Sequence, residues 1–124
     1  MVIQKSKVTA EGVIRLGQCK KVTSLTLCGN DIGAEGFAHL GTLTRLTYLN
    51  LESTHFTDND VVLLTSLPNL IDLDLGYNPG VTDAGLRHLT GLNKLANLRL
   101  YGTNVTDDGV TELKKALPKL VVGK

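Results

Sequence analysis

The sequence is poor in cysteine and aromatic residues and contains no long apolar run. Its 124 residues include two cysteines and no tryptophan, and aromatic residues make up 4% of the chain. No stretch approaches the roughly 18 consecutive apolar residues of a membrane-spanning helix, and residues 1–20 lack the apolar centre of a signal peptide. Aromatic and basic residues are not interleaved as in nucleic-acid-binding surfaces. We therefore expect neither a membrane nor a nucleic acid as partner.

The residues that carry chemistry are scattered rather than clustered. Zinc needs about four nitrogen or sulfur ligands at one point, and the three histidines have no such neighbours. The acidic run Asp58-Asn59-Asp60 matches no calcium-binding loop, and its acids are explained by the start of a helix. No glycine-rich phosphate loop is present. The sequence thus predicts no metal, no cofactor and no enzymatic activity.

What is present is a ladder of apolar residues, L-x-x-L-x-L-x-x-(N/T), that occurs four times. Its copies start 24, 24 and 25 residues apart. The apolar residues alternate with polar ones, which is typical of a half-buried strand. The closing Asn or Thr is suited to hydrogen-bond backbone groups at the following bend. The four ladders are Val22–Leu25–Leu27–Asn30, Leu46–Leu49–Leu51–Thr54, Leu70–Leu73–Leu75–Asn78 and Leu95–Leu98–Leu100–Thr103.

A helical pattern follows each ladder. Apolar residues at three- or four-residue steps form one stripe on a short helix, as in Leu86, Leu89 and Leu92. Threonines such as Thr82 precede the stripes, where they are suited to cap the helices. A repeat of this length predicts a solenoid whose units bury their apolar edges by stacking. We expect an α/β solenoid of about five units, with a curved parallel sheet on its concave face and helices on its convex face.

The repeat register extends to both ends of the chain. Residues 1–9 align with residues 98–106, so the chain begins within a repeat and has no recognisable N-terminal cap. Residues 120–122 start a further strand. We predict a single domain over residues 1–124 with an open N-terminal edge. A missing upstream segment, including a targeting sequence, is compatible with such a start.

The outward strand positions form the candidate binding surface. They gather all three tyrosines, whereas both phenylalanines occupy core positions. Tyrosine and arginine are enriched at binding hot spots, although strands also favour tyrosine for other reasons. The predicted protein-binding residues are Tyr48, Asn50, Glu52, Asp72, Asp74, Tyr77, Asn97, Arg99 and Tyr101.

Charge is unevenly distributed along the chain. Residues 1–22 hold five basic and one acidic side chains, residues 31–83 hold one and eight, and residues 84–124 hold seven and three. The differences of +4, −7 and +4 sum to the net charge of +1. Two interpretations fit this pattern equally. One is ordinary surface charge, and the other is an acidic centre that attracts a partner with a basic surface.

These motifs resemble those of leucine-rich repeat proteins over essentially the whole chain. The segments V-T-D-A-G-L-R-H-L at Val81–Leu89 and V-T-D-D-G-V-T-E-L at Val105–Leu113 are similar to cysteine-poor bacterial repeats and to repeats of F-box receptors. The segment Gly33–Leu40 is more similar to ribonuclease-inhibitor repeats. The resemblance implies a fold rather than one function.

We expect a non-enzymatic module that binds a protein or peptide on its concave sheet. The alternative is a structural repeat fragment or assembly unit that stacks through its uncapped N-terminal edge, on another chain, including a second copy, or on missing upstream repeats. Secreted members of the family commonly carry cysteine-rich caps, so two cysteines favour a cytoplasmic location.

Overall fold

The structure is a computed structural model that describes Gly12, Arg15 and residues 21–124. Within these residues, no helix combines the length and the apolar character needed to cross a membrane. The predicted strand and open edge at residues 1–9, and the cysteine at position 19, lie outside the described residues. The single domain over residues 1–124 therefore remains a prediction.

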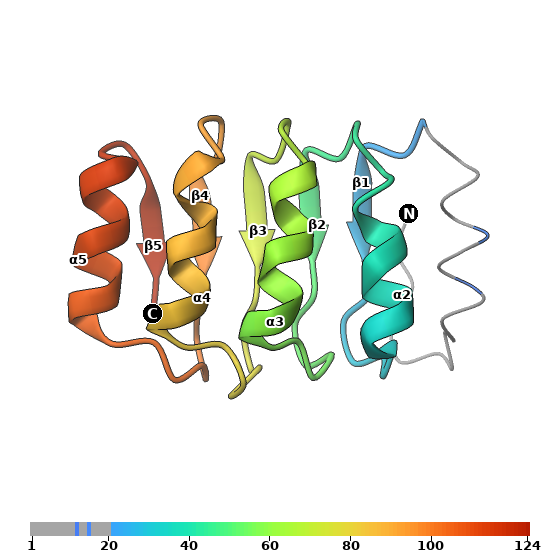
Figure 1. The fold of residues 1–124 in the computed structure, drawn as a ribbon, viewed down its shortest axis with the longest axis horizontal. Coiled ribbons are helices and arrows are strands. Elements are labelled where there is room, and N and C mark those ends of the chain that lie inside the picture. The colour runs from blue at the N-terminus through green and yellow to red at the C-terminus, as the bar shows by residue number, and fades with distance from the viewer. Residues whose placement is uncertain (1–11, 13–14, 16–20) are drawn as a thin grey trace.

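Within residues 21–124, five short parallel strands form one sheet in chain order (Figure 1). They are β1 (Ser24–Thr26), β2 (Tyr48–Asn50), β3 (Asp72–Asp74), β4 (Asn97–Arg99) and β5 (Val121–Gly123). Equivalent repeat positions pair across the sheet, as in the row from Ser24 through Tyr48 and Asp72 to Asn97. The register predicted from the repeat is confirmed, and residues 121–123 form a strand that pairs with β4.

The helices cover one face of the sheet and leave the other face uncovered (Figure 1). They are α2 (Gly33–Leu40), α3 (Asp58–Val61), α4 (Asp83–Leu86) and α5 (Asp107–Ala116). In the two middle units a 3₁₀ helix continues the α-helix, namely η1 (Val62–Ser66) and η2 (Arg87–Gly91). The sequence predicted one short helix in each unit but not the change from α-helix to 3₁₀ helix within it. A 3₁₀ helix rises about 2.0 Å per residue against 1.5 Å in an α-helix, so the second half of these two helices is more extended.

The leucines of the ladders and the helix stripes meet in one apolar core. Leu49, Leu73 and Leu98 are fully buried between the sheet and the helices. The rings of Phe37 and Phe56 pack edge to face, with centroids 4.9 Å apart. The predicted core positions are thus confirmed over the described part of the chain, and the core fixes which strand positions remain outside it.

Asn78 closes the bend after β3 by bonding to two successive units. Its side chain is fully buried, and its Nδ2 donates to the carbonyls of Leu51 and Leu75 at 2.9 and 3.0 Å. Its Oδ1 accepts from the backbone amides of Thr54 and Phe56, each at 3.0 Å. The predicted role of the closing Asn or Thr is confirmed here, because one side chain satisfies backbone groups that the bend leaves unpaired.

A second set of hydrogen bonds joins the helix starts of neighbouring units. Asp58 accepts from the backbone amide of Thr82 at 2.8 Å and from its hydroxyl at 2.5 Å. Asp83 repeats both contacts with Thr106, at 2.8 and 2.5 Å. The threonines also occupy the N-cap positions of α4 and α5, as predicted. The acids, predicted only to favour the helix dipole, therefore also tie each unit to the next.

Candidate functional site

The sheet face that the helices leave uncovered is called the open sheet face below. Its first column contains Tyr48, Asp72 and Asn97, and its second contains Asn50, Asp74 and Arg99. Glu52 and Tyr101 occupy the next position in their units, and Tyr77 the one after that, where the strands turn towards the helices. All nine predicted binding residues therefore lie on this face or at the bend that borders it.

Tyr77 occupies a backbone conformation that favours glycine. The equivalent residues of the four units are Gly29, Ser53, Tyr77 and Gly102, with φ values of 75°, 55°, 53° and 70°. A side chain in this left-handed region costs about 1–2 kcal/mol. Two of the four units have glycine at this position, whereas Ser53 and Tyr77 place a side chain in this region. Tyr77 is the aromatic member of the four.

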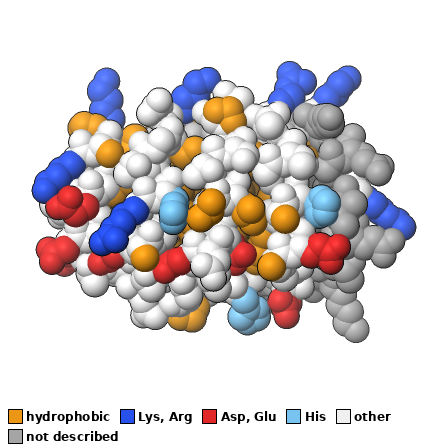
Figure 2. Space-filling view, in the orientation of Figure 1, with side chains coloured by type: hydrophobic (Ala, Val, Ile, Leu, Met, Phe, Trp, Pro, Cys, Tyr) orange, Lys and Arg blue, Asp and Glu red, His pale blue; other side chains and the backbone are white. Residues whose placement is uncertain are grey.

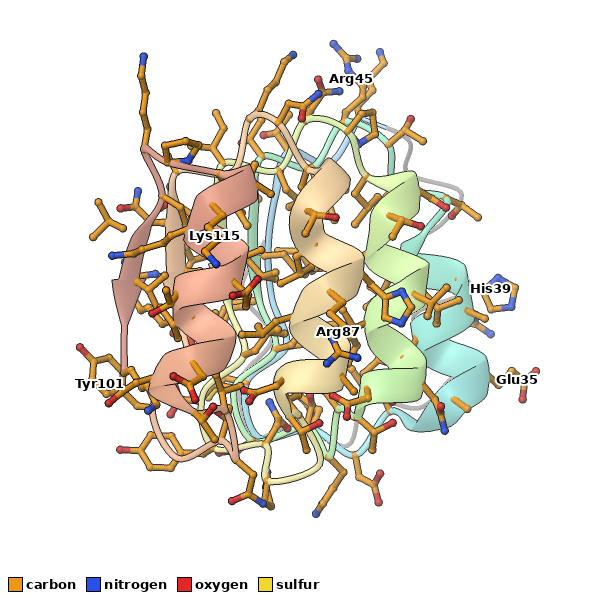
Figure 3. The ribbon with its side chains drawn as sticks, turned by 60° about the vertical axis from the view of Figure 1, so that its left-hand side comes forward. Glu35, His39, Arg45, Arg87, Tyr101 and Lys115 are labelled. Atoms are coloured by element: carbon orange, nitrogen blue, oxygen red, sulfur yellow. The ribbon has the colours of Figure 1, made fainter. Side chains whose placement is uncertain are left out.

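The rings of Tyr77 and Tyr101 each lie against a glycine of the following unit. A Cβ atom at Gly102 would come 2.6 Å from Cδ1 of Tyr77, and one at Gly123 would come 2.9 Å from the Tyr101 hydroxyl. The two tyrosines are adjacent, because the amide of Tyr77 donates to the carbonyl of Tyr101 at 2.6 Å. They remain 60% and 49% exposed. The bend thus presents two supported aromatic rings to solvent, and Figure 3 shows Tyr101 at this end of the molecule.

The acidic residues of the open sheet face are not equally accessible. Asp72 and Glu52 are half-buried. Asp74 is only 9% exposed, and its Oδ1 accepts from the amide of Gly76 at 2.9 Å. The carboxylate therefore stabilises its own turn, and a partner contact at Asp74 stays a prediction. Asn50 makes the equivalent bond to the amide of Glu52 at 2.8 Å while staying half-buried.

The remaining predicted residues provide a mixed polar surface. Tyr48 and Asn97 are half-buried, and Arg99 is exposed. Counting charged side chains on the open sheet face gives three acids (Glu52, Asp72 and Asp74) and one base (Arg99), a net charge of −2. The face therefore carries a modest negative charge beside its two exposed rings.

Asp83 and Asp107, which lie at helix starts, make contacts within the fold. The hydroxyl and the amide of Thr106 lower the pKa of Asp83, and Lys124, which lies 2.8 Å from the carboxylate, lowers the pKa of Asp107. No group of three or more His, Cys, Asp or Glu side chains suited to a metal ion occurs among residues 21–124 or at the two earlier described positions. Non-enzymatic function remains a prediction.

Comparison with known proteins identifies the repeat. The family model described as Leucine Rich repeat matches residues 18–38 and 66–90, and residues 21–38 and 66–90 belong to the stacked units described above. The chain is a leucine-rich repeat protein. The match does not distinguish among the repeat subtypes considered from the sequence.

Similar proteins include leucine-rich repeat-containing protein 42 from two vertebrates. The Xenopus tropicalis protein is 32% identical over 111 residues, which cover 82% of this chain and 27% of that protein. The Rattus norvegicus protein is 32% identical over 112 residues, or 81% and 27%. Tonsoku-like protein of Danio rerio is 41% identical over 70 residues, or 49% and 5%. This leucine-rich repeat chain therefore spans about a quarter of the length of the first two relatives.

Solved leucine-rich repeat structures share the fold. A Leptospira interrogans leucine-rich repeat protein superposes with a TM-score of 0.68 at 20% identity, over 90% of this chain and 27% of that one. An internalin of Listeria monocytogenes gives a TM-score of 0.59 at 21% identity, over 90% and 37%. These similarities confirm the predicted α/β leucine-rich repeat solenoid.

Proposed function

We propose that this chain binds a protein or peptide on its open sheet face. The observation that carries the proposal is the pair of exposed rings of Tyr77 and Tyr101, supported by the glycines of the next units. Tyrosine provides a large contact area at low conformational cost, and rings that are already held in place lose less freedom on binding. Repeat solenoids use such extended surfaces for binding.

The charge of the same face indicates the chemistry of the partner. Asp72 and Glu52 are accessible acids on neighbouring units, and the net charge of the face is −2 by the count above. A partner with basic side chains next to an apolar anchor would complement this arrangement. The anchor would contact the tyrosines, and the basic side chains would meet the two acids.

The strained backbone of Tyr77 supports the assignment independently. A glycine at this position would adopt φ near 53° without cost, as Gly29 and Gly102 do at 75° and 70° in their own units. Ser53 has a similar φ of 55° in the preceding unit, and among the four units it is Tyr77 that places an aromatic ring at this position. The proposal accounts for that ring as part of a binding hot spot.

The test measures the affinity of a captured partner for matched variants. The partner is isolated from lysate of the source organism on immobilised chain, identified by mass spectrometry and produced separately. Its affinity is then measured for wild type, for Tyr77→Ala/Tyr101→Ala, and for Val62→Ala. Val62 is a matched control because it is 44% exposed on the helix side.

We expect the double tyrosine variant to weaken binding at least about 30-fold, the loss typical of a hot spot. Val62→Ala should bind within about twofold of wild type. Asp74 is not a suitable test position, because its carboxylate holds the amide of Gly76. Binding that survives in the double tyrosine variant but disappears in Val62→Ala would place the partner on the helices instead.

A further inference from the structure

The turns that lead from each helix to the next strand carry a row of basic residues. The residue directly before the first apolar residue of each ladder is Lys21, Arg45, Asn69, Lys94 and Lys119 in successive units. The four cations are exposed. Because the units stack in register, equivalent residues line one edge of the solenoid, which is called the basic rim below. Figure 2 shows Lys and Arg side chains along this upper rim, and Figure 3 labels Arg45 there.

Basic and acidic residues thus lie at opposite edges of the solenoid, in addition to their uneven distribution along the chain. The rim turns, residues 21–23, 41–47, 65–71, 90–96 and 116–120, contain no Asp or Glu. At the opposite edge, acids such as Glu35, Asp58 and Asp83 begin the helices. Within the described part of the chain, none of the four rim cations is paired with a carboxylate. Their charge is thus free to act on a partner.

Hydrogen bonds keep part of the rim ordered. Lys94 Nζ donates to Oδ1 of Asn69 at 2.9 Å, and Asn69 Nδ2 donates to the carbonyl of Thr44 at 3.0 Å. Asn69, the neutral member of the row, therefore fixes the position of the Lys94 ammonium along the rim. A row that is partly fixed before binding loses less conformational freedom when it meets a partner.

A hollow of about 250 Å³ opens at the rim between the last two turns. Its lining includes Leu95, Leu117, Pro118 and Leu120, with Lys119 beside them. Leu95, Leu117 and Leu120 are 5%, 7% and 3% exposed, whereas the equivalent leucines of two earlier units are 0% exposed, namely Leu43, Leu46, Leu67 and Leu70. The edges of the three leucines form the apolar floor of the hollow next to the cations. This combination suits one aliphatic side chain flanked by anionic groups.

We propose that the basic rim is a second interaction surface, which binds an extended acidic segment of a partner protein. The segment would place one aliphatic side chain in the hollow and its carboxylates on Lys119, Lys94 and Arg45. Strands lie about 4.8 Å apart, so the row from Lys21 to Lys119 is about 19 Å long. An extended peptide covers that length with about six residues, and its alternate side chains lie about 6.7 Å apart on one side.

A peptide fits this surface better than a nucleic acid. Single-stranded nucleic acids are bound by aromatic side chains interleaved with cations, and none of the described rim turns contains an aromatic residue. The floor of the hollow is aliphatic and includes a proline. Carboxylates with one apolar side chain therefore match the rim, and the surface is distinct from the negatively charged open sheet face.

The probe is a fluorescein-labelled peptide of about ten residues, with alternating glutamates and one central leucine. Fluorescence anisotropy at near-physiological salt measures its affinity for wild type and two charge-reversed variants. Lys94→Glu/Lys119→Glu changes the rim. Arg87→Glu/Lys114→Glu is the matched control, because it makes the same change in net charge at exposed positions on the helix side. Circular dichroism confirms that both variants remain folded.

We expect the rim variant to bind the peptide at least about tenfold more weakly, and the control to stay within about threefold of wild type. Replacing the leucine of the probe with serine should also weaken binding. No binding to wild type, equal losses in the two variants, or unchanged affinity of the serine peptide would overturn the proposal. So would tighter binding of an oligothymidine of the same charge, which would identify a nucleic-acid surface.

Discussion

Replacing Asn78 should be the most damaging polar substitution in the bends. Its side chain is fully buried and bonds to backbone groups of two units. In wild type, Oδ1 of Asn78 lies 3.0 Å from the amide nitrogens of both Thr54 and Phe56. In Asn78→Ala both amides lose this acceptor. A buried polar group left without a partner costs about 1–3 kcal/mol. For two such groups, the free energy of unfolding should fall by about 2–6 kcal/mol.

Urea denaturation of wild type, Asn78→Ala and Thr103→Ala measures this effect. Thr103 occupies the equivalent position of the next unit, is half-buried, and makes one side-chain bond, from Oγ1 to the carbonyl of Leu100 at 2.7 Å. Its loss should cost only about 1 kcal/mol. If the two substitutions lower the free energy of unfolding equally, Asn78 does not carry the inter-unit role assigned to it.

Four further substitutions test the bend, a helix end and the ties between units. Tyr77→Gly should unfold with a free energy within about 1 kcal/mol of wild type, because relief of the backbone strain at φ 53° offsets the lost ring contacts. Its affinity for the partner should fall. A large loss of stability in thermal melts would contradict this prediction. Gly102→Ala should destabilise by at least about 1–2 kcal/mol, because φ is 70° and the new Cβ meets Tyr77. Gly91→Ala, with open space around it, should be neutral or slightly stabilising in the same urea titration. The pKa of Asp83 is lowered by Thr106 from its ordinary value of 3.8, so its carboxylate stabilises the fold above that pH, and the contribution is lost as the pH falls through the folded-state pKa. Asp83→Asn should reduce this acid sensitivity in denaturation measured from neutral pH to pH 3, and an unchanged slope would refute the assignment.

The repeat made the fold predictable because every unit has apolar residues at the same positions and buries them by stacking on its neighbours. Alternation within each ladder identified Leu49, Leu73 and Leu98 as buried, and equal spacing placed Tyr48 beside Asp72 in the sheet. Both features depend on local sequence and on in-register stacking. They therefore needed no knowledge of side-chain contacts between units.

Contacts between units were less accessible to sequence reasoning. The bonds from Asp58 to Thr82 join residues 24 positions apart, and each residue alone has a local explanation at a helix start. The alternation rule gives the face on which Asp74 lies but does not reveal that its carboxylate bonds to Gly76. The basic rim also remained hidden, because charge counted along the chain averages over the two edges of every unit.

NMR chemical-shift mapping tests the central claim most directly. The 13.3 kDa chain is titrated with the partner that it captures from lysate, and shifts are followed for every assigned residue. The proposed function predicts the largest shifts at Tyr77, Arg99 and Tyr101 on the open sheet face and its bend. Large shifts confined to α3, α4 and α5, with those three residues unchanged, would contradict it.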